Sequence, residues 1–346
     1  MIQGSVFYII ITFSVILLLA GIACKAELTD IPSGSWPLGL EPDFFLPKDN
    51  PLGDTVVLLG KRLFFDVRLS KNLSVSCATC HKPEFGFSNR TSVAEGVFKQ
   101  KGKRKVPTVV NRLFGKYQFW DGRATSLEDQ IVGPLFNPIE MGIDEKTLVE
   151  RLQTDPVYPH LFREAFGSEI SLDGVVKAIA SFERTLVSGG SPFDRYEWNG
   201  EEDALSDSGK RGLELFRGKA RCSLCHIGVN FTDERFHNIG VGNGEGQEDP
   251  GRMAITNDPM DFGKFRTPSL RNVDLRAPYM HDGSISSLED VIELYNDGGR
   301  QNANLDEEIK PLNLNAEEKS DLVEFLKSLT GPIISVKVEE LRRIAE

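Results

Sequence analysis

The feature that most constrains this chain is the pattern Cys-x-x-Cys-His, which occurs twice, at residues 77–81 and 222–226. In this pattern the two thiols form thioethers to the vinyl groups of a haem, and the adjacent histidine lies under the same porphyrin as an iron ligand. A single Cys-x-x-Cys pair also occurs in zinc sites and thiol redox motifs, but two copies that continue with histidine predict two covalently bound haem c groups. The residues concerned are Cys77, Cys80, His81, Cys222, Cys225 and His226.

The remaining cysteine and the N-terminal residues indicate where such a protein is located. The two motifs use four of the five cysteines, and the fifth, Cys24, follows an apolar run over residues 6–23. Covalent haem attachment takes place outside the cytoplasm, so an export signal is expected, although this one lacks the usual Lys or Arg before its apolar run. Cleavage before Cys24 would allow a lipid anchor on that cysteine, whereas an uncleaved run of about 18 residues would be just long enough to span a membrane. Both interpretations predict a periplasmic protein tethered to the membrane.

The length and charge of the chain limit the number of domains and the class of partner. After a signal or anchor at residues 1–24, the rest of the chain is long enough for two domains. We expect an N-terminal haem domain at 25–190, a C-terminal haem domain at 191–331 and a C-terminal tail at 332–346, because residues 188–192 are rich in Ser, Gly and Pro. The formal net charge of −11 argues against a nucleic-acid partner.

Apolar residues at helical spacing, without a run of alternating strand pattern, predict a mainly α protein. Helices are expected over residues 172–186, after an N-cap at Ser206, and after an N-cap at Asn315, where Glu318 completes a capping box. Segments such as 231–268 are dense in Gly, Asn and Asp, and we expect them to form ordered loops over haem. The sequence therefore predicts two cytochrome-c-like haem domains with long ordered loops.

Several ordered motifs outside the haem pentapeptides resemble those of the bacterial di-haem cytochrome c peroxidases and of their relative MauG, a di-haem enzyme that matures a tryptophan-derived cofactor in another protein. The resemblance extends from residue 50 to residue 332. It implies that peroxide is cleaved at the first haem and that the second haem passes electrons to it. The motifs are LFFDVRLS, FWDGRA, NPIEMG, FRTPSLRN and APYMHDG, at residues 63–70, 119–124, 137–142, 265–272 and 277–283.

The resemblance assigns three residues to catalysis. Glu140 matches the family's carboxylate over the first haem, which takes a proton from one peroxide oxygen and delivers it to the other. Gln130 matches the hydrogen-bonding companion of that carboxylate. Trp120 matches the tryptophan between the haems, where an indole can carry the hole from one iron to the other. Taken alone, Glu140 would more often be a surface carboxylate and Trp120 a core aromatic.

Two departures from the ordinary peroxidases point to the MauG-like branch. Those peroxidases bind the first iron at rest with a histidine from the loop after the first haem, but residues 82–119 contain neither His nor Met. The first haem is therefore expected to be five-coordinate or water-bound. At the second haem, Tyr295 stands where those peroxidases place an axial Met, and a phenolate favours Fe(III) and higher oxidation states. Both departures predict activity from the diferric state, unless Tyr295 only packs and Met280 or another group binds the iron.

Two further departures concern calcium and the substrate. The family holds a calcium ion between the haems with an Asn side chain and two backbone carbonyls, which Arg276 and Pro278 would offer here. Lys105 stands in place of that Asn, and its ammonium would repel calcium and could replace it. By itself Lys105 ends a basic run, 99–105, that is more typical of a solvated loop. MauG draws electrons through a surface Trp whose place is taken here by Ala220, so the MauG substrate is not implied.

The other histidines and the motif arginines have simpler interpretations. His281 is expected to form a hydrogen bond near the second haem, while His237 is expected to pack and His160 to be a surface residue. The arginines of the shared motifs are expected to neutralise haem propionates, whose burial would otherwise be costly. They are Arg123, Arg266 and Arg271.

Two classes of function remain open at this point. The first is an enzyme that reduces hydrogen peroxide with electrons from a small cytochrome, a cupredoxin or, as in MauG, an oxidisable protein side chain. The second is a di-haem electron carrier in which both irons are six-coordinate. Glu140 and Gln130 favour the enzyme, because a carrier has no use for a proton donor beside an open iron.

Overall fold

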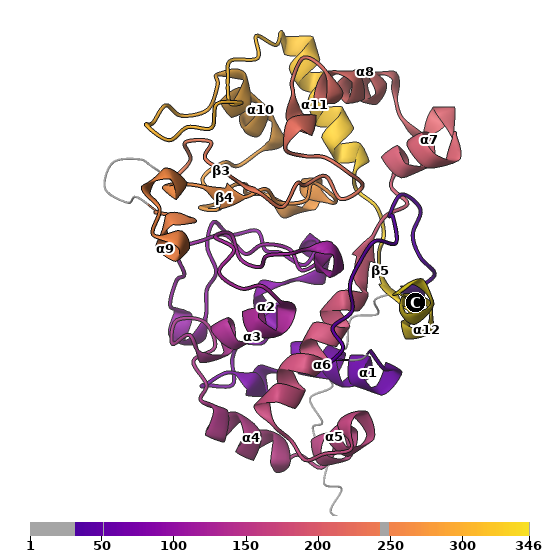
Figure 1. Ribbon diagram of the computed structural model, residues 1–346, viewed down its shortest axis with the longest axis vertical. Coiled ribbons are helices and arrows are strands. Elements are labelled where there is room, and N and C mark those ends of the chain that lie inside the picture. The colour runs from indigo at the N-terminus through magenta and orange to yellow at the C-terminus, as the bar shows by residue number, and fades with distance from the viewer. Residues whose placement is uncertain (1–31, 51, 243–248, 346) are drawn as a thin grey trace, which may run out of the picture.

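The computed structural model describes residues 32–50, 52–242 and 249–345, and this part of the chain is mainly helical, as predicted. Figure 1 shows an elongated molecule with a helical lobe at each end. The first half of the chain forms the lower lobe, and most of the second half forms the upper lobe. Long loops cover the region between them.

The lower lobe is built around the helix pair α1 (Asp54–Phe64) and α6 (Leu172–Thr185). Apolar residues at helical spacing bury one face of each helix in the largest hydrophobic cluster. At their crossing, a Cβ atom on Gly60 would lie 1.8 Å from the Ala178 carbonyl oxygen, so only glycine permits this approach. The other helices of the lobe are α2 (Cys77–Cys80), α3 (Leu127–Phe136), α4 (Glu145–Gln153) and α5 (Tyr158–Phe166).

The upper lobe repeats this arrangement with α8 (Asp207–Arg217) and α11 (Ala316–Ser328). A Cβ atom on Gly212 would lie 2.0 Å from the Asp321 carbonyl oxygen, so glycine again permits the crossing. In each lobe the helix that bears this glycine precedes a Cys-x-x-Cys-His motif. The two lobes therefore form a structural repeat, although in the sequence only the motif itself is seen to repeat. The other helices are α7 (Pro192–Asn199), α9 (Met253–Thr256) and α10 (Leu288–Asn296).

The predicted helix starts are confirmed in both lobes. The Ser206 side chain accepts from the Gly209 N–H at the start of α8. At the start of α11, Asn315 and Glu318 form the predicted capping box, in which each side chain accepts from the backbone N–H of the other. Helix α6 ends one residue before the predicted limit. Local capping chemistry therefore decides where these helices begin.

Short strands that the sequence does not indicate tie the C-terminus to the lower lobe. β5 (Ile333–Val336) pairs in parallel with β1 (Ser33–Gly34) and antiparallel with β2 (Leu186–Ser188). The helix α12 (Val338–Ala345) follows, and Leu341 packs in a buried cluster with Leu40 and Leu52. The segment expected as a tail is therefore folded onto the start of the chain over its described residues.

The remaining regular elements are short. β3 (Phe236–His237) pairs antiparallel with β4 (Phe265–Arg266) in the loop region between the lobes (Figure 1). Eight 3-10 helices occur in the described residues. They are Val67–Leu69, Pro83–Phe85, Val97–Lys99, Arg112–Phe114, Glu202–Ala204, Cys222–Leu224, Pro259–Asp261 and Val273–Arg276.

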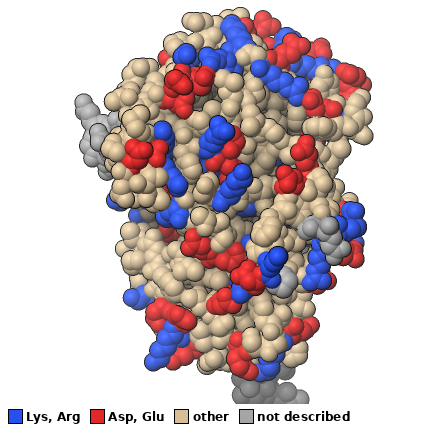
Figure 2. Space-filling model, viewed as in Figure 1, with Lys and Arg blue, Asp and Glu red and all other residues tan. Residues whose placement is uncertain are grey.

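Charged side chains of both signs lie on the surface of the molecule. On the face shown in Figure 2, acidic and basic side chains are interspersed, so this face presents no continuous patch of one sign. Within the described residues, no helix is both long enough and apolar enough to cross a membrane. The predicted anchor at residues 1–24 lies outside the described residues.

Two candidate haem sites

The first Cys-x-x-Cys-His motif lines a hollow in the lower lobe. Cys77 and Cys80 lie on α2, and His81 follows at the end of that helix. The hollow encloses about 620 Å³, part of it open to solvent. Two residues that the sequence places far from the motif, Gln130 on α3 and Glu140 in the turn after it, line the same hollow. The fold therefore brings the predicted catalytic pair to the predicted first haem.

The second motif lines a larger hollow of about 1890 Å³, also partly open to solvent. The hollow lies beside Cys222, Cys225 and His226, and its walls come from both lobes. Trp120 and Lys105 reach it from the lower lobe, and α10 supplies a wall from the upper lobe. The four motif cysteines form no disulfide within the described residues, and each motif has the room beside it that a covalent haem needs.

The two motif histidines have the protonation state and the hydrogen bonds that a ligand to iron needs. His81 Nδ1 lies 3.1 Å from the Phe87 carbonyl oxygen, and His226 Nδ1 lies 2.9 Å from that of Phe231. Burial lowers the pKa of His81 to about 4 and lowers that of His226, so both imidazoles are neutral. A neutral ring that donates from Nδ1 to a carbonyl leaves Nε2 as the lone-pair atom for a metal. Both sites therefore fit a haem with a proximal histidine.

The Glu140 side chain is held at the first hollow by its own turn. Asn137 Nδ2 donates to Glu140 Oε1 at 2.8 Å, and the Glu140 carbonyl accepts from the Val97 N–H at 2.8 Å. Burial raises the pKa of Glu140, although the Asn137 hydrogen bond and Arg123 oppose it. A carboxyl whose pKa is raised by burial holds its proton more readily and can both accept and return one.

A second carboxyl lines the first hollow, and sequence reasoning missed it. Glu183 lies on α6, is 3% exposed, and its Oε2 has no hydrogen-bond partner among the described residues. Burial raises its pKa to about 8, so Glu183 is mostly neutral at pH 7. The sequence contained a signal for this residue. Glu183 is a charged residue within the predicted helix 172–186, at a position where the helix would be expected to present an apolar residue to the core.

Tyr295, on α10, lines the second hollow, as its predicted ligand role requires. Burial raises the pKa of its phenol, and the thiols of Cys222 and Cys225 raise it further. No hydrogen bond to a described residue contributes to that shift. Met280, the alternative ligand, lines the same hollow, so the geometry brings both candidates to the second site.

His281 and Trp120 pack together at the second hollow. Their rings make an edge contact with centroids 6.5 Å apart, and Phe265 stacks on His281 at 3.5 Å. His281 Nε2 has no partner among the described residues and faces Gly242, where an added Cβ would lie 2.5 Å away. Trp120 Nε1 donates to the Lys105 carbonyl oxygen at 2.8 Å. The predicted inter-haem indole is thus fixed at the second hollow, while the hydrogen bond expected of His281 is absent from the described residues.

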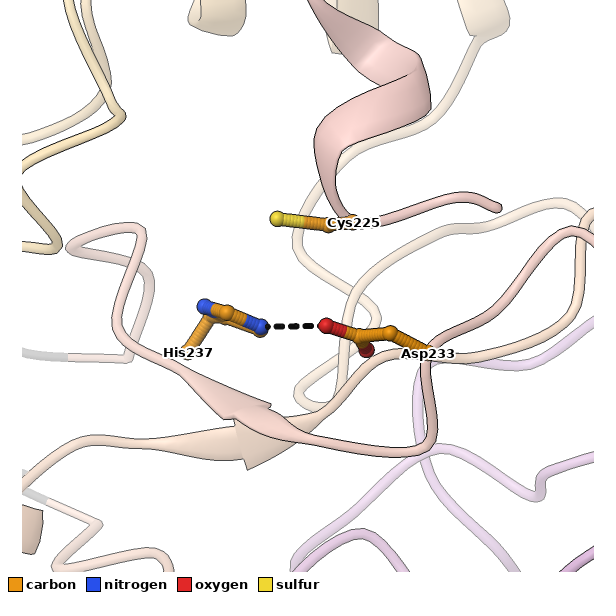
Figure 3. A group of neighbouring side chains, drawn as sticks. All are labelled: Cys225, Asp233 and His237. Atoms are coloured by element: carbon orange, nitrogen blue, oxygen red, sulfur yellow. Dashed lines mark hydrogen bonds and ion pairs between the residues drawn. The ribbon is translucent and has the colours of Figure 1, made fainter.

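Cys225, Asp233 and His237 form a cluster that has the composition of a metal site (Figure 3). His237 Nε2 lies 3.0 Å from Asp233, and Nδ1 lies 2.6 Å from Asp306. The Cys225 thiol, Asp306 and Asp233 raise the pKa of His237 to about 10. Because both ring nitrogens donate to carboxylates, the ring is an imidazolium and has no lone pair for a metal. His237 is therefore a fixed cation beside the second hollow, and its predicted packing role is only part of what it does.

Buried guanidinium groups at the second hollow fit the propionates of a haem. Arg112 and Arg266 share one carboxylate, Glu234, at 2.8 and 2.9 Å. Arg276 has no ion pair among the described residues, and its buried Nε lacks a partner. Three guanidinium charges against one carboxylate leave two positive charges (3 − 1), which two propionates would balance.

The three predicted propionate partners lie in different surroundings. Arg266 lines the second hollow, where it would be in reach of a haem propionate. Arg271 instead forms a fully buried ion pair with Asp194 at 2.7 Å, and Arg123 pairs with Asp121. Arg112 and Arg276 were missed, because the sequence does not show which arginines the fold leaves without a carboxylate. His160 is exposed, as predicted.

Lys105 is buried, contrary to the solvated loop that its basic run suggested. Its Nζ donates to the Asn89 carbonyl oxygen, to Asn89 Oδ1 at 2.7 Å and to the Thr91 carbonyl oxygen at 3.2 Å. Burial lowers its pKa to about 8, as does the nearby charge of Arg276. The ammonium therefore sits among neutral oxygen atoms, which is the type of donor that also binds calcium.

The sequence of this chain is similar to those of known di-haem proteins. A profile of the family described as "Di-haem cytochrome c peroxidase" matches residues 54–203. The methylamine utilization protein MauG of Methylorubrum extorquens is 44% identical over 299 residues, covering 85% of this chain and 84% of MauG. Cytochrome-c peroxidase IdrP1 of Pseudomonas sp. is 36% identical over 325 residues, covering 85% of this chain and 86% of that protein.

A solved structure shows the same architecture. The crystal structure of a MauG-like protein associated with microbial copper homeostasis superposes with a TM-score of 0.80 at 35% identity, covering 86% of this chain and 96% of that chain. The predicted fold class is therefore confirmed. Because this family carries two c-type haems, the two hollows are expected to hold one each. The chain belongs to the di-haem cytochrome c peroxidase and MauG family of oxidoreductases.

Proposed function

We propose that this protein reduces hydrogen peroxide at the haem of the first hollow, with electrons that pass through the haem of the second, and that it starts from the diferric state. The observation that carries the proposal is the first hollow itself. There Glu140, with a raised pKa, and Gln130 face the site of a Cys-x-x-Cys-His motif. Residues 82–119, from which ordinary relatives take a resting ligand, offer neither His nor Met.

The haem supplies an iron on which the O–O bond can be cleaved. Glu140 takes a proton from the inner oxygen of peroxide and returns it to the outer oxygen, which leaves as water. Gln130 donates a hydrogen bond that orients peroxide beside the carboxylate. Two electrons and two further protons complete the reduction to two molecules of water. Asn137 holds Glu140 in place during both proton transfers.

Electrons leave the second site through Trp120. Its indole lines the second hollow and is anchored to the chain of the lower lobe by the Lys105 carbonyl. Tyr295 would hold the second iron through its phenol oxygen, because it lines the second hollow and no hydrogen bond to a described residue competes for that oxygen. A hard anionic oxygen ligand stabilises the oxidised iron, so the second haem can share the oxidising equivalents.

The proposal is tested with the ferric protein as isolated. We expect its EPR spectrum to show one high-spin and one low-spin ferric haem, and peroxide to change the Soret band without prior reduction. Two low-spin signals and no reaction of the diferric protein would contradict the proposal. Met141 would then be the first residue to replace, because its thioether also lines the first hollow.

A MauG-like oxidation of a protein side chain is the second candidate function. It is favoured by Tyr295, which stands at the MauG-like position, and by the 44% identity to a protein named MauG. The place of the MauG surface Trp is taken here by Ala220, which is 5% exposed, so a protein substrate would need another route. A small donor cytochrome or a cupredoxin is the alternative source of electrons, and single-turnover oxidation of each class of donor distinguishes them.

Lys105 is proposed to replace the calcium ion of the family. Its ammonium already binds three oxygen acceptors close to the Arg276 and Pro278 segment, so a divalent cation would meet a like charge there. We expect EDTA to leave the peroxide reaction and both haem spectra of the wild type unchanged. The matched variant Lys105→Asn should gain a response to added Ca²⁺. Loss of the wild-type reaction in EDTA, with recovery on adding Ca²⁺, would contradict this assignment.

The periplasm is the proposed location, with a tether at the N-terminus. The support is the pair of covalent haem sites and the apolar run before Cys24. Labelling of cells with palmitate, with and without Cys24→Ser, tests the lipid anchor. A lipid-anchored protein should take up the label only when Cys24 is present, whereas an uncleaved anchor should leave both forms unlabelled.

A further inference from the structure

The basic run at residues 99–105 has no part in the proposed function apart from Lys105, and the structure shows where its other members lie. Residues 94–102 form a short hairpin whose two arms are joined by backbone hydrogen bonds at 2.9 Å. Gly96 and Gly102 of this hairpin line the first hollow, and Lys105 lines the second. The basic run therefore lies on the segment that connects the two hollows.

The side chains of this run differ in the direction they take. Gln100 faces the turn after α3, where its Nε2 donates to the Pro138 carbonyl oxygen at 3.0 Å. Arg104 is partly buried and pairs with Asp121 at 2.6 Å and with Asp249 at 2.7 Å. Three lysines are exposed instead, and none of them forms an ion pair or a side-chain hydrogen bond with a described residue. They are Lys99, Lys101 and Lys103, called here the exposed lysines of the run.

The tip of the hairpin presents an aromatic ring among these charges. The Phe98 side chain is 62% exposed, and Phe98 and Lys99 have positive φ angles of 57° and 59°. This backbone conformation costs free energy in residues that carry a Cβ atom. The hairpin is held in place by the Val97 N–H, which donates to the Glu140 carbonyl oxygen at 2.8 Å. A tip that is fixed before binding loses less conformational entropy when a partner docks on it.

The charge and shape of this surface fit a protein partner with an acidic surface. Residues 94–103 carry three lysines and one carboxylate, Glu95, which leaves two positive charges (3 − 1) in a chain whose formal net charge is −11. An aromatic side chain surrounded by charged groups is the usual anatomy of a protein–protein contact. A membrane-binding element would present a broad apolar face, whereas Phe98 is the one exposed apolar side chain in residues 94–103.

We propose that the exposed lysines of the run and Phe98 form the docking surface for an acidic electron-donor protein. The inference rests on the proposed peroxidase function and names the charge of its donor. Each docked donor gives one electron to the haem of the second hollow, beside which the run ends at Lys105, and leaves in its oxidised form. Two donor molecules therefore supply the two electrons that one peroxide consumes. Opposite charges on the two proteins increase the rate of their encounter, and salt decreases it.

The test uses the holoprotein, hydrogen peroxide and two reduced donors, an acidic c-type cytochrome and a basic one. We expect kcat/KM for the acidic cytochrome to fall as the ionic strength rises. Exchange of the three exposed lysines of the run for glutamate should lower this kcat/KM by roughly 10-fold or more and remove its fall with salt. Carbodiimide cross-linking gives a readout besides activity, because it should join carboxylates of the acidic cytochrome to these lysines in the wild type. Mass spectrometry identifies the joined residues.

Matched controls separate the docking surface from net charge and from exposed rings in general. Exchange of three exposed lysines elsewhere for glutamate changes the net charge equally and should keep most of the wild-type kcat/KM. These control positions are Lys48, Lys146 and Lys337. Phe98→Ala should raise KM for the acidic cytochrome while the fall with salt persists. Phe45→Ala should leave KM unchanged, although Phe45 is 72% exposed.

Four results would count against these assignments, and they are distinguishable. Equal loss of kcat/KM in the two lysine variants would overturn the docking surface, since net charge alone would then set the rate. Cross-links from these lysines only to carboxylates of this chain would overturn it as well. Lysine-dependent binding to phosphatidylglycerol vesicles, without any change in kcat/KM for the acidic cytochrome, would assign the surface to a membrane. Absence of any Soret change when peroxide is added to the wild type without donor would instead overturn the proposed function.

Discussion

Replacement of Glu140 by glutamine is expected to keep both haems attached and to slow peroxide cleavage by roughly 100-fold or more, the usual worth of general acid–base assistance. Glutamine keeps the size of the side chain and can still accept from Asn137 Nδ2, so the turn should stay in place. What it loses is the ability to take a proton from one peroxide oxygen and return it to the other. The measurement is stopped-flow oxidation of the ferric protein at several peroxide concentrations.

The pH dependence gives this prediction a second readout. The carboxylate form of Glu140 is the one that accepts the proton, so the wild-type rate should fall as the pH drops through the Glu140 pKa, which burial raises above its ordinary value. In Glu140→Gln this loss of rate at low pH should be absent. A wild-type rate in the variant would show that another group moves the proton.

Glu183→Gln is the matched control for Glu140→Gln. Glu183 lines the same hollow and is also buried, but its pKa of about 8 keeps it mostly neutral at pH 7. Exchange of a neutral carboxyl for a neutral amide should therefore change the peroxide rate little. Equal slowing in both variants would mean that the polarity of the hollow, and no particular proton carrier, sets the rate.

The parts of this molecule that could be predicted from sequence are those that depend on short-range chemistry. The pentapeptides predicted both haem sites because the attachment geometry needs its residues within a few positions of one another. The starts of α8 and α11 were predictable because Ser206 and Asn315 satisfy N–H groups within their own first turns. The meeting of Gln130 and Glu140 at the first motif was predictable only through the family resemblance.

What could not be predicted depends on contacts between distant segments. Lys105 looked solvated within its basic run, but the fold buries it against Asn89 and Thr91 from another loop. β5 was not evident because a strand of four residues is decided by its partners, here residues more than 140 positions away in the chain. The unpaired state of Arg276 likewise follows from which carboxylates the fold leaves nearby. A charge count along the sequence contains none of this information.

Replacement of Tyr295 by methionine should have the largest effect on the second site. If Tyr295 binds the iron as phenolate, a thioether in its place favours Fe(II) and should raise the reduction potential of the second haem by roughly 0.1 V or more, within the ~0.8 V range that axial ligands span. The two-electron-oxidised protein should then be short-lived or absent, because the second iron no longer stabilises its share of the two oxidising equivalents. The first haem should stay open, since no His or Met in 82–119 can close it.

The experiment mixes diferric wild type and Tyr295→Met with one equivalent of peroxide and follows the Soret and near-infrared bands, while spectroelectrochemistry measures both potentials. Tyr295→Phe is the companion variant, because it removes the phenol without adding a ligand and should leave the second haem high-spin. If Tyr295 binds the iron, the second haem should keep a sixth ligand in Tyr295→Met and lose it in Tyr295→Phe. A tyrosine that does not bind the iron predicts no such difference between the two variants. Identical spectra, lifetimes and potentials in all three proteins would mean that Tyr295 is a packing residue on α10. Met280, which lines the same hollow, would then be the better candidate for the sixth ligand, and the protein would be closer to the ordinary peroxidases than to MauG.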